Sequence, residues 1–268
     1  MSKFRTFDIG GSGVKTALWE RTSGSDIRLI SDPRLFSNPD WTRLGQYLAE
    51  RIPECGETIG VSCAGFIDCP AGIVKLCRVA GWKNRPLANE FRDAFSVRDV
   101  VLLNDAEAHL AAHLDMARHP LISLSLGTSI GFAISTERGL ISRPRSDVNF
   151  DIGAMTLPTR ASDNHVWWAL GSPGLEELQK NIGQSEGVAH YGYRLGAFLV
   201  SLGSIFRPRL VVLSGGIVER HWKTMLPAVL SEMSTCKPDW LEDIEIVRSS
   251  HEKNAALWGM AKYICSIR

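Results

Sequence analysis

The stretch 4–19 has the sequence Phe-Arg-Thr-Phe-Asp-Ile-Gly-Gly-Ser-Gly-Val-Lys-Thr-Ala-Leu-Trp, in which two β-prone runs, 4–9 and 14–19, flank four small residues. Because glycine adopts positive φ without steric cost, the segment predicts two antiparallel strands joined by a tight turn. Asp8 stands at the end of the first strand and Lys15 follows the turn, whose backbone N–H groups can point at phosphate oxygens. A tight turn beside a satisfied aspartate is the alternative interpretation of this segment taken alone.

The same pattern of strand, turn and strand returns in the second half of the chain. There, 121–126 and 130–136 are β-prone and flank Gly127-Thr128-Ser129. Hydrophobic periodicity predicts further strands at 26–31, 58–63, 98–103, 210–213 and 244–247, and helices at 41–51, 106–116, 174–181, 188–206, 218–233 and 254–264. Strand meanders followed by alternating helices and strands predict a duplicated α/β fold with a cleft between the halves.

Composition and charge limit the classes of function. The chain has 268 residues, 44% hydrophobic and 22% charged, so it is long enough for two modest domains and is not disordered as a whole. Thirty Lys and Arg against 29 Asp and Glu give a net charge of +1, which provides no broad footprint for nucleic acid or an anionic membrane. The sequence has no signal-type apolar core and no apolar run of about 20 residues, which predicts a cytoplasmic protein.

Two further segments have the character of ligand sites. Leu213-Ser214-Gly215-Gly216-Ile217 closes an apolar strand and opens a helix, where missing Cβ atoms let a flat base or ribose lie against the backbone. Asp105 stands where a strand gives way to a helix, which suits a carboxylate that accepts a proton from a substrate hydroxyl. The alternative is that Asn104 or Asp105 only caps that helix. His109 and His113, four residues apart on the same helix, are better explained by surface or packing roles than by metal binding.

These elements, in this order, resemble the sugar kinases of the ROK family (repressor, open reading frame, kinase), within the actin, Hsp70 and hexokinase superfamily. The stretch 8–15 is similar to the family's first phosphate motif, with Ser12 in the place of threonine. Residues 81–87, Gly-Trp-Lys-Asn-Arg-Pro-Leu, resemble its sugar-loop signature Gly-Trp-x-Asn-x-Pro-Leu. Asn104-Asp105-Ala106 matches its catalytic Asn-Asp-Ala.

The resemblance implies an actin-like (ribonuclease H-like) two-lobe ATPase fold and a kinase that uses ATP and Mg²⁺ to phosphorylate a primary hydroxyl, the 6-OH, of a hexose or amino-hexose. It implies an N-terminal lobe, 1–117, for sugar binding and catalysis, completed by a C-terminal helix, 252–268, and a nucleotide-binding lobe, 118–251. Asp105 would be the general base, Asp8 would hold Mg²⁺ through water, and the protein would be a homodimer. The implied nucleotide ligands are Asp8, Gly10, Gly11, Ser12, Lys15, Gly127, Thr128, Ser129, Gly131, Gly215 and Gly216, and the implied sugar ligands are Gly65, Asn84, Asn104, Asp105, Asp151 and Glu176.

The chain departs from the family pattern at the family's zinc-binding segment. Asp151-Ile152-Gly153-Ala154 stands in place of Glu-x-Gly-His, and 167–177 contains no cysteine where the family is rich in cysteine. Zinc needs about four converging soft or imidazole ligands and only His165 is near, so we predict no zinc site. Without the cysteines either Glu176 or Glu177 could face the sugar, and both could instead be exposed residues of a first helical turn. The six cysteines are scattered and predict reduced thiols.

Three functions are consistent with these motifs. The first is the sugar kinase described above. The second is a degenerate sugar-binding protein without turnover, suggested by Asp151, Ala154 and Ser129. The presence of Asp8, Lys15 and Asp105 argues against it. The third is a sugar-responsive regulator, for which a DNA-binding module ahead of the first strand would be needed and is not expected, so no nucleic-acid partner is predicted.

Overall fold

The computed structural model describes residues 2–267 except 12, 23–25, 79, 117, 142–150, 158–163 and 252–253. The chain divides into two compact units. Among the described residues, unit 1 contains those of Met1–Asp115 and Asn254–Arg268, and unit 2 contains those of Met116–Ile141 and Phe150–Lys253.

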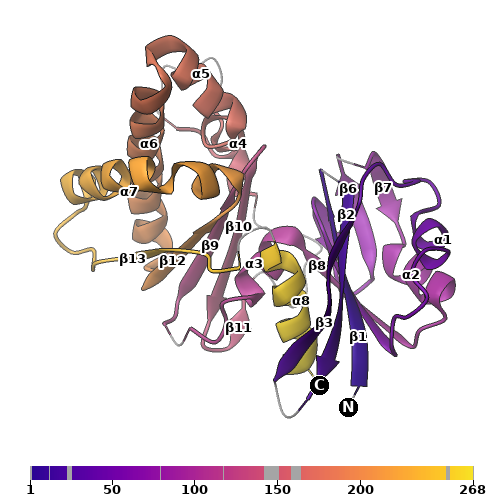
Figure 1. Ribbon diagram of the computed structural model, residues 1–268. Helices are drawn as coiled ribbons and strands as arrows, with labels where there is room; N and C mark the ends of the chain where they lie inside the picture. The colour runs from indigo at the N-terminus through magenta and orange to yellow at the C-terminus, as the bar shows by residue number, and fades with distance from the viewer. Residues whose placement is uncertain are drawn as a thin grey trace. The chain divides into compact units, whose positions relative to one another are not determined.

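Unit 1 is built on a five-stranded mixed sheet with the strand order β3-β2-β1-β4-β8. Antiparallel pairs join β3 to β2 and β2 to β1, whereas β1, β4 and β8 run parallel. Figure 1 shows α3 and α8 on one side of this sheet and α1 and α2 on the other. The bounds are β1 Ser2–Gly10, β2 Gly13–Arg21, β3 Ile27–Phe36, β4 Thr58–Cys63, β8 Asp99–Asn104, α1 Leu44–Ala49, α2 Leu87–Phe95, α3 Asp105–Ala111 and α8 Ala255–Ser266.

Side-chain alternation along β1 separates two cores in unit 1. Phe7 and Ile9 pack with Leu44 of α1 and Phe91 of α2 in one apolar cluster. Phe4 is an odd number of residues away from Phe7 and Ile9, so it lies on the opposite face and packs with α8 in a second cluster. Because neighbours two apart share a face of a strand, Asp8 lies on the α8 side of the sheet.

A second, three-stranded sheet lies between β4 and β8 in the sequence of unit 1. It has the order β5-β6-β7 and is antiparallel throughout. Its strands are short, with the bounds β5 Phe66–Asp68, β6 Ile73–Cys77 and β7 Trp82–Arg85. The sugar-loop signature therefore occupies β7 and the first residue of α2.

Unit 2 repeats the same sheet topology. Its order, β11-β10-β9-β12-β13, has an antiparallel meander followed by two parallel additions, as in unit 1. Residues of α5, α6 and α7 bury the sheet's apolar side chains in a single cluster. The bounds are β9 Leu121–Leu126, β10 Ile130–Thr136, β11 Gly139–Leu140, β12 Leu210–Ser214, β13 Glu245–Arg248, the 3-10 helix η1 Ile152–Ala154, α4 Val166–Ala169, α5 Ser172–Ile182, α6 Gln184–Phe206 and α7 Gly216–Cys236.

The predicted duplicated α/β architecture is confirmed, and several local predictions are corrected. Strand β3 continues to Phe36, beyond the predicted end at Ser31, and passes through Pro33 because an edge strand tolerates a residue without an N–H donor. The helix predicted at 41–51 is only Leu44–Ala49, because Asp40 Oδ1 accepts the backbone N–H groups of residues 42 and 43 in a turn ahead of it. The helix predicted at 106–116 ends at Ala111.

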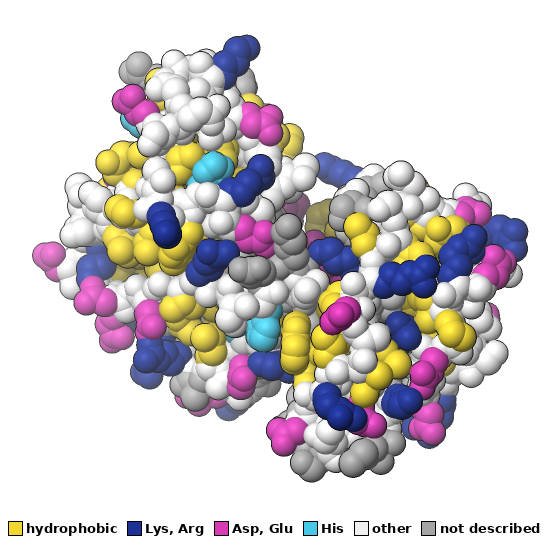
Figure 2. Space-filling model, viewed as in Figure 1, with side chains coloured by type: hydrophobic (Ala, Val, Ile, Leu, Met, Phe, Trp, Pro, Cys, Tyr) yellow, Lys and Arg dark blue, Asp and Glu magenta, His cyan; other side chains and the backbone are white. Residues whose placement is uncertain are grey.

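The surface offers no evidence for a membrane span. None of the helices in the described part of the chain combines the length and the apolar composition needed to cross a bilayer. Figure 2 shows Lys and Arg side chains next to Asp and Glu side chains on both units. This mixture agrees with the near-zero net charge of the sequence.

Helix α8 approaches α3 closely because residue 259 has no side chain. A Cβ atom at Gly259 would lie 1.7 Å from the carbonyl oxygen of Ala108. We therefore predict that Gly259→Ala lowers the free energy of unfolding by at least about 1–3 kcal/mol, the usual cost of overpacking, in a chemical denaturation experiment. Gly10→Ala is the matched control in the same unit, because no heavy atom lies within 4 Å of its added Cβ. Equal stability of the two variants would contradict this account of the helix contact.

Candidate functional site

The parallel pairing in unit 1 brings three strand ends to one edge of the sheet. Strand β1 pairs with β4 up to Ile9 and Cys63, and β4 pairs with β8 up to Cys63 and Asn104. The residues that follow these ends are therefore neighbours, although they are far apart in sequence. The edge carries the predicted site residues Asp8, Gly10, Gly11, Gly65, Asn104 and Asp105. Ser12 lies outside the described residues.

Asn104 is the N-cap of α3 and also ties two strand ends together. Its Oδ1 accepts the backbone N–H of Ala106 at 2.9 Å, and the Glu107 carboxylate accepts the backbone N–H of Asn104 at 3.1 Å, which forms a capping box. Its Nδ2 donates to the carbonyl oxygen of Gly65 at 2.7 Å. Gly65 has φ +112°, and a Cβ there would lie 2.1 Å from the Leu76 carbonyl oxygen, so only glycine fits this approach. Since Asn104 caps the helix, Asp105 is not needed for that purpose.

Asp105 is the first residue of α3, and its carboxyl has an unusual ionisation. Desolvation by burial is the largest cause that raises its pKa from 3.8 to about 7, and the negative charge of Asp8 is the second. The hydrogen bond from the Ala106 backbone N–H, 2.9 Å long, acts in the opposite direction. A carboxyl that gains and loses a proton near neutral pH can serve as a general base at that pH.

Asp8 and Lys15 lie opposite each other in the β1–β2 ladder and so share a face of the sheet. Ser62, from the adjacent strand β4, donates its hydroxyl to Asp8 Oδ1 at 2.7 Å. His109 of α3 has both residues as electrostatic neighbours. Burial lowers the pKa of His109, Asp8 raises it, and Lys15 lowers it further. The sequence interpretation of His109 as a surface or packing residue missed this proximity, which only the position of α3 over the sheet reveals.

Two thiols that were not singled out in the sequence also lie beside Asp105. Cys63 and Cys77 interact through a hydrogen bond that, with burial, raises the pKa of Cys63 well above its usual value. Both cysteines have Asp105 as an electrostatic neighbour. Both thiols are buried, and burial disfavours the reactive thiolate, so we assign them to packing. None of the six cysteines forms a disulfide.

Asn84 lies on β7, in the sheet that continues from the Gly65 strand end. Its φ is +51°, a left-handed conformation that asparagine tolerates better than most residues, and it is exposed. The Gly65 backbone approaches β6 at Leu76 and Cys77, and Cys77 pairs with Trp82 of β7. The small sheet therefore brings the sugar-loop segment toward the same edge as Asn104.

In unit 2 the predicted glycine turns lie at the ends of two parallel strands. Gly127, Thr128 and Ser129 follow β9, and Gly215 follows β12, its paired neighbour. A Cβ at Gly215 would lie 2.4 Å from the carbonyl oxygen of Leu126, the last residue of β9.

The N-terminus of α5 is attached to the same turn. Ser172 donates both its backbone N–H, at 2.7 Å, and its hydroxyl, at 3.0 Å, to the Gly127 carbonyl oxygen. The N-termini of α5 and α7 thus lie at one end of this sheet, where unpaired N–H groups and the helix dipoles favour anions. Gly131 lies within β10, and Gly216 is the first residue of α7.

The remaining predicted sugar ligands, Asp151 and Glu176, are exposed residues of unit 2. Asp151 precedes η1, and Glu176 lies on α5. Glu177 is half-buried and is an electrostatic neighbour of Arg194 on α6, whose Nη1 is buried without a hydrogen-bond partner among the described residues. The two glutamates therefore differ, with Glu177 turned toward the helix pair and Glu176 toward solvent.

The described residues contain no group of three or more His, Cys, Asp and Glu side chains placed to hold a metal ion. His165 is exposed, and its backbone pairs with Thr156 in an isolated bridge. The absence of zinc stays a prediction, because 158–163 lie outside the described residues.

Comparison with characterised proteins finds distant relatives of two kinds. The chain is 26% identical to a β-glucoside kinase of Klebsiella pneumoniae over 294 residues, covering 96% of this chain and 94% of that protein. It is 25% identical to the xylose repressor of Bacillus spizizenii, covering 77% of this chain and 60% of the repressor. It is 24% identical to an N-acetyl-D-glucosamine kinase of Histophilus somni, covering 56% of this chain and 51% of the kinase. The chain thus spans between half and two thirds of the length of the latter two proteins. No family profile matches the chain.

Solved structures extend the likeness to the whole fold. A ROK family glucokinase from Streptomyces griseus, solved with glucose and AMPPNP, superposes with a TM-score of 0.77 at 16% identity, covering 97% of this chain and 98% of that chain. The ROK hexokinase of Thermus thermophilus superposes with a TM-score of 0.73 at 21% identity, covering 98% of both chains. The chain therefore has the actin-like fold of the ROK proteins, and its resemblance to the sugar kinases of that family, predicted from its motifs, is confirmed.

Proposed function

We propose that this protein is an ATP-dependent sugar kinase that phosphorylates the primary 6-hydroxyl of a hexose or amino-hexose, with Asp105 as general base. The observation that carries the proposal is the position of Asp105 at the start of α3, at the sheet edge that also holds Asp8, where burial and the charge of Asp8 raise its pKa to about 7. General bases work best when their pKa lies near the operating pH. The carboxyl sits at a strand end beside Asn104, where the motif resemblance puts the acceptor sugar.

In the proposed reaction, the deprotonated Asp105 accepts the proton of the sugar hydroxyl as its oxygen forms a bond to the γ-phosphorus. The bond between that phosphorus and the β,γ-bridging oxygen breaks, and ADP leaves. The negative charge of Asp8 assists by raising the affinity of Asp105 for the proton. Positioning and charge stabilisation account for most of the catalysis in such transfers.

Sugar binding is proposed for Asn84, Asn104, Asp105 and the backbone at Gly65. Asn104 has two side-chain N–H donors, of which one is bonded to Gly65, so the second remains for a hydroxyl. The same hydrogen bond and the capping box hold its amide in a single orientation. A preorganised amide of this kind discriminates sharply between a sugar that presents a hydroxyl and one that lacks it.

Nucleotide binding is proposed for the glycine turns, with the phosphates at Gly10, Gly11, Ser12, Lys15, Gly127, Thr128, Ser129 and Gly131, and the nucleoside at Gly215 and Gly216. The N-termini of α5 and α7 supply N–H groups and a favourable dipole near the second set. AMPPNP in the Streptomyces griseus glucokinase supports ATP as the donor.

The donor set at Asp8 fits Mg²⁺, which keeps most of its waters and uses one or two protein carboxylates. Ser62 orients that carboxylate through its 2.7 Å hydrogen bond. When bound, Mg²⁺ would neutralise charge on the nucleotide phosphates.

Sugar selectivity is proposed to depend also on the exposed residues Asp151 and Glu176. Asp151 is one methylene shorter than the glutamate of the family pattern, and Ala154 has no hydrogen-bonding side chain. The sugar pocket is therefore expected to be wider and poorer in donors near the anomeric centre. Homodimer formation and a cytoplasmic location stay predictions.

The match to a xylose repressor favours a second candidate, a sugar-responsive protein that binds sugar without turnover. A coupled assay with ATP and a panel of hexoses and amino-hexoses separates the two. ADP release that depends on one sugar supports the kinase. Saturable sugar binding without ADP release would identify the second candidate.

Asp105→Asn is expected to lower kcat by roughly two orders of magnitude or more, because general-base assistance is typically worth 10²–10⁴. Sugar binding should survive, since an amide of the same size keeps the hydrogen-bonding shape. In the wild type, kcat/KM should rise with pH through about 7, as Asp105 loses its proton, and the variant should lack this limb. Steady-state kinetics and calorimetric sugar titration measure both effects.

The matched control is Asp99→Asn, at the other end of β8, where the carboxylate pairs with Arg98 on the surface. It should keep wild-type turnover.

Because the folded-state pKa of Asp105 is raised, its contribution to stability is present below pH 4 and is lost as pH rises toward 7. Asp105→Asn should therefore melt at a higher temperature than the wild type at pH 8, and this gap should narrow toward pH 4. Wild-type turnover in Asp105→Asn would refute the assignment.

The isolated protein is expected to contain no stoichiometric zinc. The segment that carries zinc ligands in the family lacks cysteine here, and fewer than four converging ligands do not make a structural site. Elemental analysis should find less than one zinc per chain, and far-ultraviolet circular dichroism should be unchanged after dialysis against a strong chelator. One zinc per chain, with unfolding on its removal, is the result that would overturn this prediction.

Removal of the anomeric hydroxyl is expected to be tolerated. Because Ala154 and Asp151 are expected to leave a roomy pocket there, kcat/KM for the 1-deoxy analogue should fall less than roughly a hundredfold, within the range of discrimination by space alone. Analogues altered at the hydroxyls that Asn84, Asn104 and Asp105 are proposed to bind should lose roughly 10⁴-fold, because they leave polar groups of the site unpaired. A loss above about a thousandfold for the 1-deoxy sugar would show that another residue, such as His165 or Glu177, makes the missing contact.

A further inference from the structure

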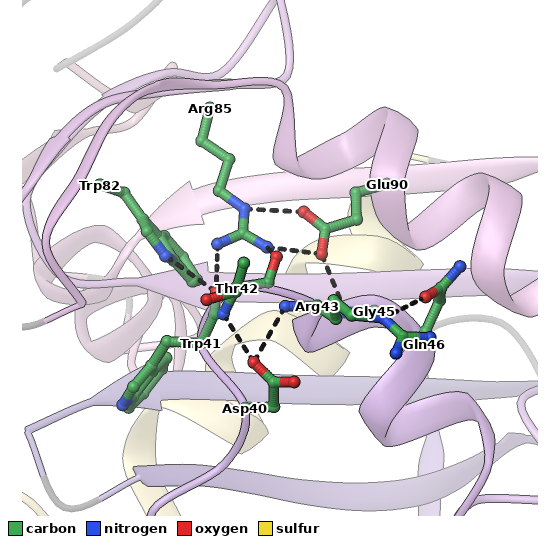
Figure 3. A network of polar contacts seen from close by, with 9 residues as sticks. All are labelled: Asp40, Trp41, Thr42, Arg43, Gly45, Gln46, Trp82, Arg85 and Glu90. Atoms are coloured by element: carbon green, nitrogen blue, oxygen red, sulfur yellow. Dashed lines mark hydrogen bonds and ion pairs between the residues drawn. The ribbon is translucent and has the colours of Figure 1, made fainter.

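The guanidinium of Arg85, at the end of β7, is bonded on every side (Figure 3). Its Nε and Nη2 donate to the two carboxylate oxygens of Glu90 at 2.7 and 2.6 Å. Its Nη1 donates to the carbonyl oxygen of Trp41, and Nη2 also donates to that of Thr42 at 3.1 Å. The group stacks over Trp82, with 4.1 Å between the guanidinium carbon and the ring centroid. The side chain is only 14% exposed, so solvent weakens these contacts little.

The partners of Arg85 are themselves fixed. Glu90 Oε1 accepts the backbone N–H of Gly45 at 2.9 Å, which connects α2 to the first turn of α1. Asp40 Oδ1 accepts the N–H groups of Thr42 and Arg43, at 3.0 and 3.3 Å, and so shapes the turn that presents the carbonyl groups. Figure 3 shows the two segments, 40–46 and 82–90, facing each other across this network.

Trp82 is held at the same anchor. Its indole N–H donates to the Trp41 carbonyl oxygen at 3.2 Å, and the two indoles pack edge to face with 5.8 Å between ring centroids. Both ends of β7 are therefore attached to the turn ahead of α1. Between them, the β6–β7 ladder includes Lys83 and Arg85 but not Asn84.

Asn84 thus sits in a strained backbone conformation between two anchored neighbours. A non-glycine residue at φ +51° lies in a sparsely populated region of backbone conformation, and it persists where the surrounding structure fixes it. Asn84 is exposed, and its side chain has no hydrogen bond to another described residue that would fix it. The surrounding network supplies the restraint that this conformation needs.

We propose that Arg85 is a positioning residue that holds the turn at Asn84 in the conformation that binds the sugar. This inference rests on the proposed kinase function, in which Asn84 contacts a substrate hydroxyl. The sugar-loop signature leaves the position of Arg85 unspecified, so the resemblance assigns it no role. Arg85 acts through the backbone of Asn84 and makes no contact with the substrate itself.

The chemistry of the network requires arginine rather than any cation. The planar fork of guanidinium matches both oxygens of Glu90 and still has donors for two carbonyl groups. The ammonium of lysine has three donors on a flexible stem and lacks the flat surface that stacks on Trp82. Arg85→Lys therefore keeps the charge but loosens the turn.

The test compares Arg85→Lys with Arg92→Lys. Arg92 lies on α2 and bonds only to the surface residue Asn89 in the described network, so it is the matched control. We expect Arg85→Lys to weaken sugar binding roughly 10- to 100-fold, with KM for the sugar rising in parallel and kcat and KM for ATP nearly unchanged, because misplaced binding groups cost about that much. The double variant Asn84→Ala/Arg85→Lys should bind sugar less than about twofold more weakly than Asn84→Ala alone, because the two residues act as one unit.

Hydrogen exchange of the 80–87 backbone gives a readout that does not depend on activity. Arg85→Lys should speed exchange in this segment at least about tenfold, whereas Arg92→Lys should not, because local opening needs the network to be broken. If Arg85→Lys does not fold, Arg85→Leu combined with Glu90→Leu removes both charges and should show the same exchange and binding effects. Unchanged exchange or unchanged sugar affinity in the folded variant overturns the inference. A wild type that binds no sugar overturns the proposed function instead, and the exchange result still decides whether Arg85 fixes the turn.

Discussion

The candidate site in unit 1 depends on the parallel pairing of β1, β4 and β8. This pairing places the ends of β1 and β8 at the same edge of the sheet, on either side of β4, and Asp8 raises the pKa of Asp105 there. Two carboxylates in a desolvated environment do not ionise independently, because the charge of one raises the pKa of the other. The ionisation of Asp105 is thus a property of the sheet topology as much as of the residue itself.

Helix α3 has to start at this edge for the same chemistry to arise. The side chain of Asn104 caps the N-terminus of α3, so the carboxyl of Asp105 is not needed as the cap. Close packing of α8 against α3 at Gly259 holds the helix against the sheet. Helix α8 therefore supports the site in two ways. It contacts the backbone of α3 at Gly259, and it packs with Phe4 and Trp19 of the sheet in an apolar cluster.

Sequence reasoning predicted the two large sheets well because their inner strands are rich in apolar residues, and β1, β9 and β12 end at glycine turns. It missed the β5–β6–β7 sheet, whose strands of three to five residues are too short for a clear period. Helix α2 could have been predicted, because Leu87 and Phe91 are four residues apart and both are buried. The choice between Asn104 and Asp105 as the cap could not be made, since both residue types cap helices equally well. The Arg85 network was not predictable either, because two of its acceptors are backbone carbonyl oxygens more than forty residues away.

The fold alone cannot distinguish a kinase from a sugar-binding regulator, because relatives of both kinds match this chain at nearly the same identity. The distinction has to come from the site. Binding a sugar requires hydrogen-bond donors and acceptors in the right places, and a neutral amide at residue 105 would serve that purpose without a buried charge. A carboxyl whose pKa is raised to about 7 destabilises the folded chain at neutral pH, a cost that binding does not explain. Proton transfer does explain it, because a general base must lose its proton in the folded protein and accept another during the reaction. This cost supports the proposed role of Asp105 as a general base.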